Sequence, residues 1–518
     1  MNRRDFLRQS AYAALLPRIS WRSGQTNGGE LSIPLTLVAP SGRARRELIN
    51  AGVPFAPGQL RDPDRLRVAD SAGREIPCAV RVLEPWRVPP GRTPPGALSI
   101  RAVQIQFEAS VSKEPVRVTI RLGDPRPGGS RPIVPAAETL RDRNGLDGPR
   151  VIPLLPAGWL CASRAAGDQM PAQASGEQAG YERLVERSFP GSLSFINSDV
   201  FHHWLFDRTS TYYTQYVRTG ARPFFDAAFH CAHFMRLHTA TKPPDAGAFT
   251  LKGADVKYVY PRAMHLHYLL TGDDRALEAG RVMARFCLDR WEPEYRPGQY
   301  AEPPLGTDPE KGRPFWSTRN EAYGLLGVLH GWEMTGDEAY WRAIARYVDA
   351  LAAHQAQPPD GRPPDGSWRQ NWALYDPNET KIAGGASPWM TAILLSALYH
   401  AWRVTDDERI PGMVTRWCDF LDRRGFVPDG SRVRYVVDCF GSDHVNGDDM
   451  EQHSTELACS FAMGIFFSQD DGQRARFRRR FDALFKAAAE IDANSPARCY
   501  NWAFQSSSQL VYFMNRRP

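Results

Sequence analysis

A short motif recurs four times between Phe206 and Asp407, and it constrains the fold more than any other feature of the chain. Each time, an apolar helical run ends in a similar sequence and another helical run follows. A Gly directly after a helix suits a left-handed C-cap, and the Asp after it can cap the next helix. The pattern therefore predicts a series of helical hairpins. The four motifs are Tyr216-Val-Arg-Thr-Gly220, Leu269-Leu-Thr-Gly-Asp273, Glu333-Met-Thr-Gly-Asp337 and Arg403-Val-Thr-Asp-Asp407.

The spacing of these motifs indicates how the hairpins are arranged. Their threonines, Thr219, Thr271, Thr335 and Thr405, are 52, 64 and 70 residues apart, which is too irregular for a tight solenoid. Two further hairpins are expected around residues 467–471 and 502–514. Six hairpins closed in a ring make an (α/α)6-type toroid, an architecture whose site lies at one end of the ring. We therefore predict a mainly α protein with this toroid at residues 199–518.

A different pattern precedes the helices. Short segments in which apolar and polar residues alternate, such as 31–37, 79–83, 103–107 and 116–122, are separated by Gly, Pro and Asp. This pattern is typical of a small sandwich or barrel. We expect an all-β domain at residues 30–160 and a connector at 161–198 that is partly strand and partly loop.

The first residues resemble an export signal. Arg3 and Arg4 are followed by Phe6, Leu7 and the short apolar run 11–16, a pattern typical of twin-arginine signals. We expect residues 1–29 to be signal and linker and the protein to be periplasmic or secreted. No other segment is long and apolar enough to cross a membrane.

Composition excludes several classes of function. The net charge is +6, but no Lys/Arg block is concentrated enough for a nucleic-acid footprint. The chain contains no Gly-x-Gly-x-x-Gly, phosphate-binding loop, Gly-x-Ser-x-Gly or His-Glu-x-x-His motif, which disfavours dinucleotide, nucleoside triphosphate, esterase and zinc-protease chemistry. Aromatic residues make up 11% of the chain, which is compatible with surfaces that stack sugars. An acidic polysaccharide is compatible with the positive charge.

The first candidate group lies between Asp255 and Tyr268, where a helix is expected to begin. Lys257, Tyr258 and His265 can give or take a proton near neutral pH if their surroundings shift their pKa values. The alternative is that the tyrosine packs at a junction and the histidine is a hydrogen-bonded core residue. His265 and His267 are two positions apart, so they point to different helix faces and do not form a metal pair.

The second group is Phe315-Trp-Ser-Thr-Arg-Asn-Glu-Ala322, at another expected helix start. Glu321 is explained by a capping box with a preceding hydroxyl residue, but it also remains a candidate for substrate binding. Capping does not explain Trp316 or Arg319. A bidentate Arg beside an aromatic face is what binding a uronic-acid carboxylate would need.

Two further groups lie in long segments between hairpins, which are usually functional in a compact domain. Asn371, Trp372 and Tyr375 lie in one polar segment, and Trp389 follows a glycine-bearing segment at a helix start. Residues 438–453 hold five carboxylates and His444, which is compatible with a calcium-like oxygen cluster or with acid/base catalysis. The spacing is not that of an EF-hand, and an ordinary acidic loop is the alternative.

Several of these segments resemble a known family. Gly52-Val-Pro-Phe55, the segment 67–77 and the strand 100–107 look like the RIFT-barrel domain of exo-acting rhamnogalacturonan lyases. Asp255-Val-Lys-Tyr258, Phe315-Trp-Ser-Thr-Arg319 and Ser387-Pro-Trp-Met390 look like the toroid of such proteins. The similarity covers residues 31–465, and the chain has no obvious C-terminal β domain of the kind found in that family.

The resemblance implies β-elimination from a uronic-acid residue. Arg319 would neutralise the carboxylate, and Lys257 or His265 would remove the C5 proton, with His444 as a further candidate base. Tyr258 or Tyr375 would protonate the departing O4. No cofactor or metal is required, because an arginine can supply the positive charge, although calcium remains an alternative at residues 438–453.

Two other functions stay open. An inverting glycoside hydrolase on the same toroid would use two carboxylates about 6.5–9.5 Å apart. A non-catalytic glycan-binding protein would use the aromatic residues alone. The carboxylates available to the hydrolase are Asp255, Glu321, Asp438, Asp448 and Glu451.

Overall fold

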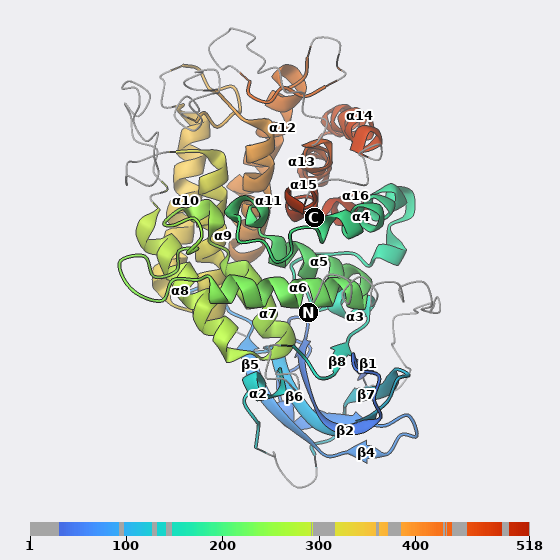
Figure 1. Cartoon of the computed structure of the whole chain (residues 1–518). Helices are drawn as coiled ribbons and strands as arrows, with labels where there is room; N and C mark the ends of the chain where they lie inside the picture. Colours follow the sequence, from blue (N-terminus) through green and yellow to red (C-terminus); the bar gives the residue numbers. More distant parts are fainter. Residues whose placement is uncertain are drawn as a thin grey trace.

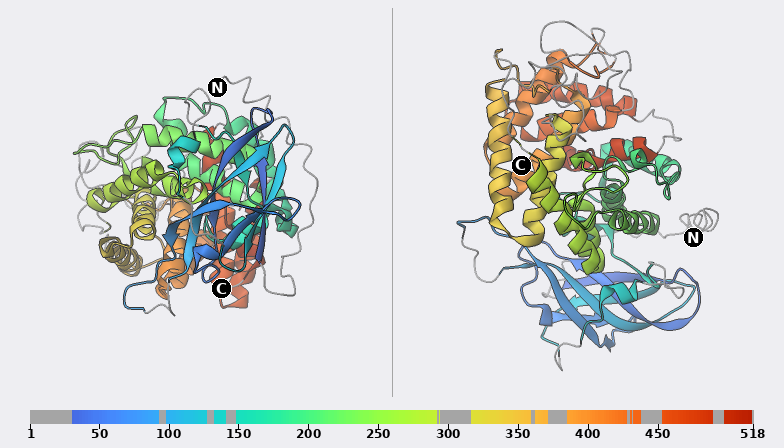
Figure 2. Two further views of the ribbon diagram at one scale, coloured as in Figure 1. Left: turned by 90° about the horizontal axis from the view of Figure 1, so that it is seen from below. Right: turned by 60° about the vertical axis from the view of Figure 1, so that its left-hand side comes forward.

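The computed structural model shows a small β domain beneath a larger helical domain (Figures 1 and 2). Strands occur only at the N-terminal side of the described chain, and the ring of helices begins at Arg208. The structure describes residues 31–92, 98–126, 132–140, 148–291, 293, 316–358, 362–370, 385–427, 430, 432–437, 453–488 and 497–516.

The β domain contains two antiparallel sheets, as the alternating segments predicted. The first has the strand order β4-β3-β7-β1-β8 and the second the order β2-β6-β5. In β1, Ile33, Leu35 and Leu37 point into the core while the residues between them are less buried. The resemblance to a RIFT barrel stays a prediction. The strands are β1 Leu31–Val38, β2 Arg45–Pro54, β3 Leu66–Ala69, β4 Glu75–Ile76, β5 Cys78–Pro85, β6 Ile100–Val111, β7 Val116–Leu122 and β8 Ile152–Leu154.

Six inner helices form a closed ring, which confirms the predicted toroid. Each inner helix contacts the next, and the last, α15, returns to the first, α5. The inner helices are α5 Arg208–Thr219, α7 Pro261–Thr271, α9 Thr318–Thr335, α11 Pro388–Thr405, α13 Ser454–Phe467 and α15 Ala497–Gln505.

Outer helices pack around the ring (Figure 1). The inner helix α9 is buried on nearly every side, whereas the outer helices, such as α12, bury a single apolar face. The outer helices are α4 Ala179–Ser192, α6 Arg222–Leu237, α8 Asp274–Arg290, α10 Glu338–Ala356, α12 Arg409–Arg424 and α14 Asp471–Ala488. The remaining α-helices are α2 Ala136–Thr139, α3 Ala157–Ala162 and α16 Leu510–Asn515.

The four sequence motifs adopt one repeated geometry at the C-terminal ends of inner helices. Each threonine hydroxyl donates to the carbonyl four residues earlier, at 2.6–2.8 Å. The next residue is left-handed, with φ between 57° and 71°. It is Gly in three motifs and Asp406 in the fourth. Asp273 and Asp337 then cap the following outer helices, as predicted.

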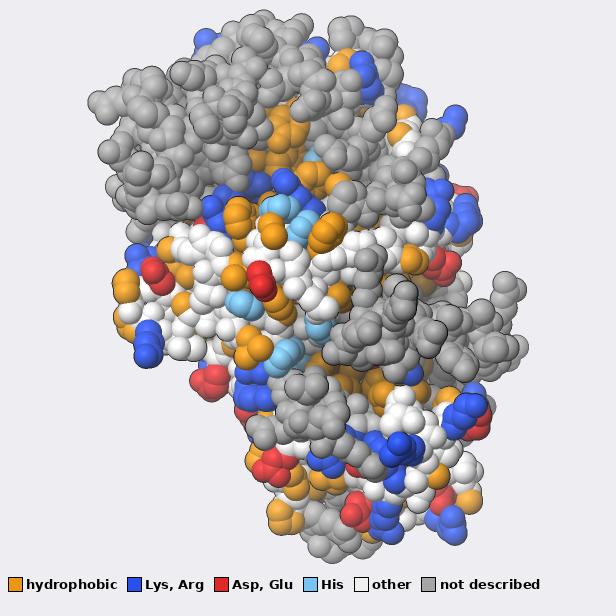
Figure 3. Space-filling model, in the orientation of Figure 1, with side chains coloured by type: hydrophobic (Ala, Val, Ile, Leu, Met, Phe, Trp, Pro, Cys, Tyr) orange, Lys and Arg blue, Asp and Glu red, His pale blue; other side chains and the backbone are white. Residues whose placement is uncertain are grey.

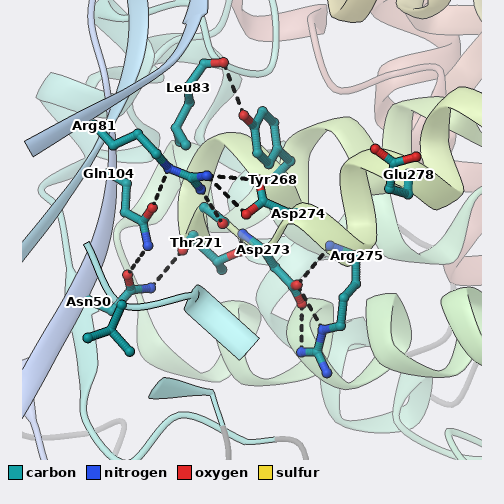
Figure 4. A network of polar contacts seen from close by, with 12 residues as sticks. Asn50, Arg81, Leu83, Gln104, Tyr268, Thr271, Asp273, Asp274, Arg275 and Glu278 are labelled. Carbon is teal, nitrogen blue, oxygen red and sulfur yellow. Dashed lines mark hydrogen bonds and ion pairs between the residues drawn. The ribbon is translucent and has the colours of Figure 1, made fainter. Parts of the chain in front are cut away.

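These C-terminal ends rest on the β domain. Arg81 of β5 donates to the carbonyl oxygen of Gly272 and to the Asp274 carboxylate, and Asn50 of β2 donates to the carbonyl oxygen of Thr271 (Figure 4). Gly52 of β2 lies so close to α7 that an added Cβ would be 2.4 Å from the carbonyl oxygen of Leu269. The junction is therefore a close backbone contact reinforced by donors to helix C-terminal carbonyls.

The connector differs from the expectation of strand and loop. In the structure, residues 163–195 contain α4 and two short 3-10 helices, and no strand is assigned within them. Helix α4 packs against α15 through the Tyr181–Phe504 ring contact. The apolar pattern of this segment is weak, and the helix is stabilised by its packing against α15. The sequence alone therefore did not identify the helix.

Candidate functional site

The N-terminal ends of the inner helices meet at the end of the ring that faces away from the β domain. This follows from the direction of the chain, because the C-terminal ends of α7 and α9 lie against the β domain. Every inner helix places at least one aromatic or charged residue near this opposite end. These residues are Asp207, Lys257, Arg319, Trp389, His453 and Trp502.

Arg319 and Trp389 come together at this end. Ser317 caps α9 by accepting a hydrogen bond from the backbone of Asn320, which places Arg319 in the first turn. The Arg319 guanidinium lies over the Trp389 indole of α11, with Cζ 5.3 Å from the ring centre. Both side chains are buried. The Trp389 indole N–H has no hydrogen-bond partner among the described residues.

Lys257 lies in the short 3-10 helix Val256–Tyr258, just before α7. Asp255 caps this turn through the backbone of Lys257, and its other oxygen is 2.6 Å from the Lys257 ammonium. Lys257 and Asp255 are both buried, so their opposite charges compensate one another in a region of low dielectric constant. The same turn contacts α9, which places Lys257, Arg319 and Trp389 at one end of the ring.

Aromatic rings surround Trp389. His453, which precedes α13, stacks on it at 5.0 Å with an interplanar angle of 16°, and His453 is 4.6 Å from the Trp502 ring of α15. Arg498 lies 4.5 Å above the face of Trp502. The indole N–H of Trp502 also lacks a hydrogen-bond partner within the described residues. Unpaired indole donors of this kind suit the hydroxyl groups of a sugar.

Three residues at this end were missed by sequence reasoning: Asp207, Tyr323 and Glu456. Burial raises the pKa of Asp207 to about 6, against hydrogen bonds from Ser210 and the charge of Arg262. Burial also raises the pKa of Glu456, which His453 opposes. Burial and the charge of Asp207 raise the pKa of Tyr323 well above its ordinary value. Perturbed groups gathered in one place are typical of functional sites.

These three residues have unusual surroundings in the structure but no distinctive pattern in the sequence. The Tyr323 hydroxyl and one Glu456 oxygen are buried without a hydrogen bond in the described structure. Phe206 and Asp207 both have positive φ, 71° and 45°, a strained backbone that non-glycine residues rarely adopt. In the sequence, Asp207 is only a plausible helix cap, and Tyr323 and Glu456 are ordinary positions within helices.

Trp316 and Glu321 lie on the outer side of α9. Trp316 packs on His354 of α10, with ring centres 4.5 Å apart. Glu321 does not close a capping box, because Ser317 is the cap and Asn320 occupies the position that the motif requires. Its carboxylate instead accepts from the Trp291 indole at 2.8 Å, and burial raises its pKa well above the usual range.

His265 lies at the other end of the ring. Its Nε2 is 2.8 Å from the carboxylate of Glu84 in the β domain, so the structure does not bring it together with Lys257 and Arg319. His267 points elsewhere, to the Tyr213 hydroxyl at 2.6 Å, as its separate helix face predicted. The other predicted site residues, Asn371, Trp372, Tyr375, Asp438, His444, Asp448 and Glu451, lie outside the described residues.

Helix polarity adds to the charge at this end. The N-terminus of a helix carries a partial positive charge, and six such ends converge here. Side chains cap α5 and α9, whereas α7, α11 and α13 have no side-chain hydrogen bond at their N-caps. Together with Arg319 and Lys257, these ends favour an anionic group.

One outer face of the helical domain carries histidine side chains. Figure 3 shows histidine side chains gathered on the helical domain, with Lys or Arg side chains close above them. None of the described helices is both long enough and apolar enough to span a bilayer.

Comparisons with known proteins assign no family. No protein-family model matches the chain, and no curated protein matches its sequence. Solved structures that resemble it include an unsaturated glucuronyl hydrolase mutant from Streptococcus agalactiae, at 11% identity and a TM-score of 0.44 over 68% of this chain and 96% of that one. A family 88 glycosyl hydrolase from Bacteroides vulgatus has 11% identity and a TM-score of 0.46, over 65% and 99%. A polysaccharide lyase has 11% identity and a TM-score of 0.45, over 67% and 99%. Likeness at this level assigns no activity.

Proposed function

We propose that this protein is a carbohydrate-active enzyme that binds a uronic-acid-containing glycan, of the rhamnogalacturonan kind, and cleaves it by β-elimination. The observation that carries the proposal is the Arg319 guanidinium over the Trp389 indole, at the end of the ring where the helix N-termini converge. A guanidinium pairs with a carboxylate through two parallel hydrogen bonds, and an indole N–H that has no partner among the described residues can donate to a sugar hydroxyl. A uronic acid presents both groups on one small residue.

The chemistry follows from the neighbours of this pair. Arg319 holds the C6 carboxylate and stabilises the negative charge that develops there when the C5 proton leaves. Lys257 first passes its own proton to the Asp255 carboxylate 2.6 Å away and then takes the C5 proton as a neutral amine. The electron pair of the broken C5–H bond forms the C4=C5 double bond as the C4–O4 bond breaks.

The departing O4 needs a proton, and two tyrosines are available. Tyr258 is adjacent to Lys257, and the Tyr323 hydroxyl is buried within the electrostatic reach of Arg319. The Tyr323 hydroxyl has no hydrogen bond among the described residues and is ready to donate to a substrate oxygen. His265 has no part in this scheme, because it lies against the β domain.

A second candidate function rests on a different observation. Asp207 and Glu456 are buried carboxylic groups with raised pKa values at the same end of the ring. An inverting glycoside hydrolase needs one carboxylic acid to protonate the leaving oxygen and a second carboxylate to activate water. These two residues replace Asp255 and Glu321 as its catalytic pair, because Asp255 is paired with Lys257 and Glu321 faces Trp291.

One assay separates the two functions. Purified protein is mixed with a panel of acidic polysaccharides, including rhamnogalacturonan, and both ultraviolet absorbance of the unsaturated uronide and new reducing ends are measured. A rise in absorbance that Arg319→Lys lowers by about 100-fold or more supports the lyase. Arg218→Lys is the matched control, because Arg218 is also an entirely buried arginine but lies in the last turn of α5, paired with Glu182.

The other outcomes contradict the lyase. New reducing ends without ultraviolet absorbance, lost in Asp207→Asn and Glu456→Gln, establish hydrolysis. Tight glycan binding without either product shows a binding protein. Equal loss in Arg319→Lys and Arg218→Lys means that the loss reflects folding, and the assigned role of Arg319 is then wrong.

A further inference from the structure

A compact group of metal-binding side chains lies at the opposite end of the ring, beneath the inner helices. His265 comes from α7, and His330 and Glu333 come from the last turns of α9. His330 and Glu333 are three residues apart on one helix, so their side chains share a face. All three side chains are buried, with at most 8% of any residue exposed.

The separations within this group are those of ligands around one ion. Nδ1 of His330 lies 3.1 Å from Nδ1 of His265 and 3.1 Å from Oε2 of Glu333. The distance between Nδ1 of His265 and Oε2 of Glu333 is 3.7 Å. Ligand atoms about 2.1 Å from a tetrahedral zinc ion lie about 3.4 Å from one another. The observed triangle brackets this value.

Surrounding groups orient two of the three ligands from behind, whereas Nε2 of His330 has no hydrogen-bond partner among the described residues. Nε2 of His265 lies 2.8 Å from a Glu84 oxygen, and a carboxylate can only accept, so this ring nitrogen carries the hydrogen. The lone pair on Nδ1 then points into the group. Arg101 holds the other Glu84 oxygen at 3.0 Å. A carboxylate behind a histidine ligand is the arrangement that orients metal-binding histidines in proteins.

Glu333, like His265, has one atom held by neighbouring groups and one atom that points into the group. Oε1 is held by His400 at 3.2 Å and by Arg101 at 3.4 Å. Oε2 points toward the two histidines and is buried without a hydrogen bond in the described structure. A buried carboxylate oxygen that lacks a partner is costly, so an occupant of this position is expected.

Two occupants compete for the position. A single proton on Nδ1 of His330 can serve either Nδ1 of His265 or Oε2 of Glu333, each 3.1 Å away, but it cannot serve both fully. A divalent ion uses all three atoms at once.

A cavity beside the group provides access. It has a volume of about 560 Å³ and lies between the β domain and the helices, with His330, Glu333, Arg101, Trp86, Arg262 and His400 among its lining residues. A coordination position on this side is open to water or to a small anion, which the arginines would favour.

We propose that His265, His330 and Glu333 bind one divalent transition-metal ion, zinc by their donor set, with an open coordination position toward this cavity. Two imidazoles and one carboxylate are a common zinc donor set. The proposal does not depend on the glycan site, which lies at the other end of the ring.

The experiment uses the full chain without a polyhistidine tag. The protein is stripped with a chelator, dialysed and titrated with Zn²⁺ and with Co²⁺. Metal content, the visible absorption of bound Co²⁺ and the thermal midpoint are then measured. We expect one ion per chain, Co²⁺ bands of a site with nitrogen ligands, and a higher thermal midpoint with Zn²⁺.

Variants identify the site. His330→Ala and Glu333→Gln should lose the bound ion, and Glu84→Gln should weaken binding by about 10–100-fold while leaving all three ligands in place. His267→Gln is the matched control, because this histidine is similarly buried on α7 but contacts Tyr213, and it should retain the ion.

The contrary results are distinct. Uptake of less than one ion per chain by the wild type, with no shift of the thermal midpoint, means that a proton occupies the position. Equal uptake by wild type and Glu333→Gln places the ion elsewhere. Since Glu84→Gln removes no ligand, the proposal can be tested even if His330→Ala does not fold.

Discussion

The two ends of the helical ring are built from the same helices but satisfy their polar groups differently. At the C-terminal end, the last carbonyls of the inner helices receive hydrogen bonds from the β domain, as those of Gly272 and Glu333 do from Arg81 and Arg87. At the N-terminal end, buried donors such as the Trp389 indole have no partner among the described residues. The helix carbonyls at one end are thus satisfied by the β domain, whereas buried indole donors at the other end are left to a ligand.

The comparison also explains the sign of the expected ligand. Helix C-termini carry partial negative charge, and arginines of the β domain lie against them. Helix N-termini carry partial positive charge, and Lys257 and Arg319 add to it. An anionic substrate is therefore expected at the open end, and the uronic-acid proposal meets this requirement.

The largest expected effect is on catalysis at the end of the ring where the inner helices begin. Lys257→Met should lower kcat/KM on the glycan by about 1,000-fold, because the base that takes the C5 proton is removed. Lys252→Met is the control, because Lys252 lies five residues earlier and packs over Phe201, and it should change the rate by less than about threefold. Equal losses would show that Lys257 has no role in proton transfer.

A pH-dependent effect should follow at Asp207. Burial raises its pKa in the folded protein to about 6, so the protonated form is favoured by folding. Its contribution to stability is therefore present below about pH 4 and is lost as the pH rises through 6. Asp207→Asn should make the protein more stable than wild type at pH 7.5 by about 2 kcal/mol, with a smaller difference at pH 5.

Chemical unfolding at both pH values measures this difference. If the gap between variant and wild type stays the same at pH 5 and pH 7.5, the burial of Asp207 does not control its titration. If Asp207→Asn is less stable at both, its capping bond to Ser210 outweighs the burial cost.

At the junction between β2 and α7, an added side-chain atom is expected to lower the stability of the protein. Gly52→Ala should destabilise the protein by about 1–3 kcal/mol, because its Cβ would lie 2.4 Å from the α7 backbone, which cannot move as a side chain can. Gly158→Ala in α3 meets nothing within 4 Å and should be neutral or slightly stabilising. Denaturant unfolding of both variants tests this, and equal effects would contradict the close contact.

The smallest effect concerns the one motif without glycine. Asp406 is left-handed, with φ of 57°, and its carboxylate pairs with Arg92 at 2.8 Å. Asp406→Gly and Asp406→Ala both lose this exposed pair, but only Ala retains the steric cost of the left-handed backbone. The Gly variant should therefore be more stable than the Ala variant by about 1 kcal/mol. Equal midpoints of thermal unfolding would show that the position is not strained.

The sequence predicted the ring well. Local chemistry controls helix ends, so the Thr-Gly-Asp motifs predicted the hairpins and their caps. Arg319, Lys257 and Trp389 were singled out near expected helix starts, and they lie at one end of the ring, but their roles stay predictions. Glu321 was assigned to a capping box, which would require Thr318 as the cap. The cap is Ser317 instead, and the Glu321 side chain contacts Trp291.

Residues that matter through distant partners gave no local signal. Tyr323 and Glu456 are ordinary helical positions, and their burial together depends on how α9 and α13 face one another in the ring. His265 was grouped with Lys257 because they are eight residues apart, yet the inner helix between them carries the histidine toward the β domain.

By itself, the sequence determined the helical hairpins and the β domain. These features depend on backbone preferences and periodicity, which act over a few residues. Only the tertiary structure decided that the two domains share a close junction, that Arg319 lies over Trp389, and that His265, His330 and Glu333 converge. These contacts join residues far apart in the chain, and closure of the ring places both ends of every inner helix at once.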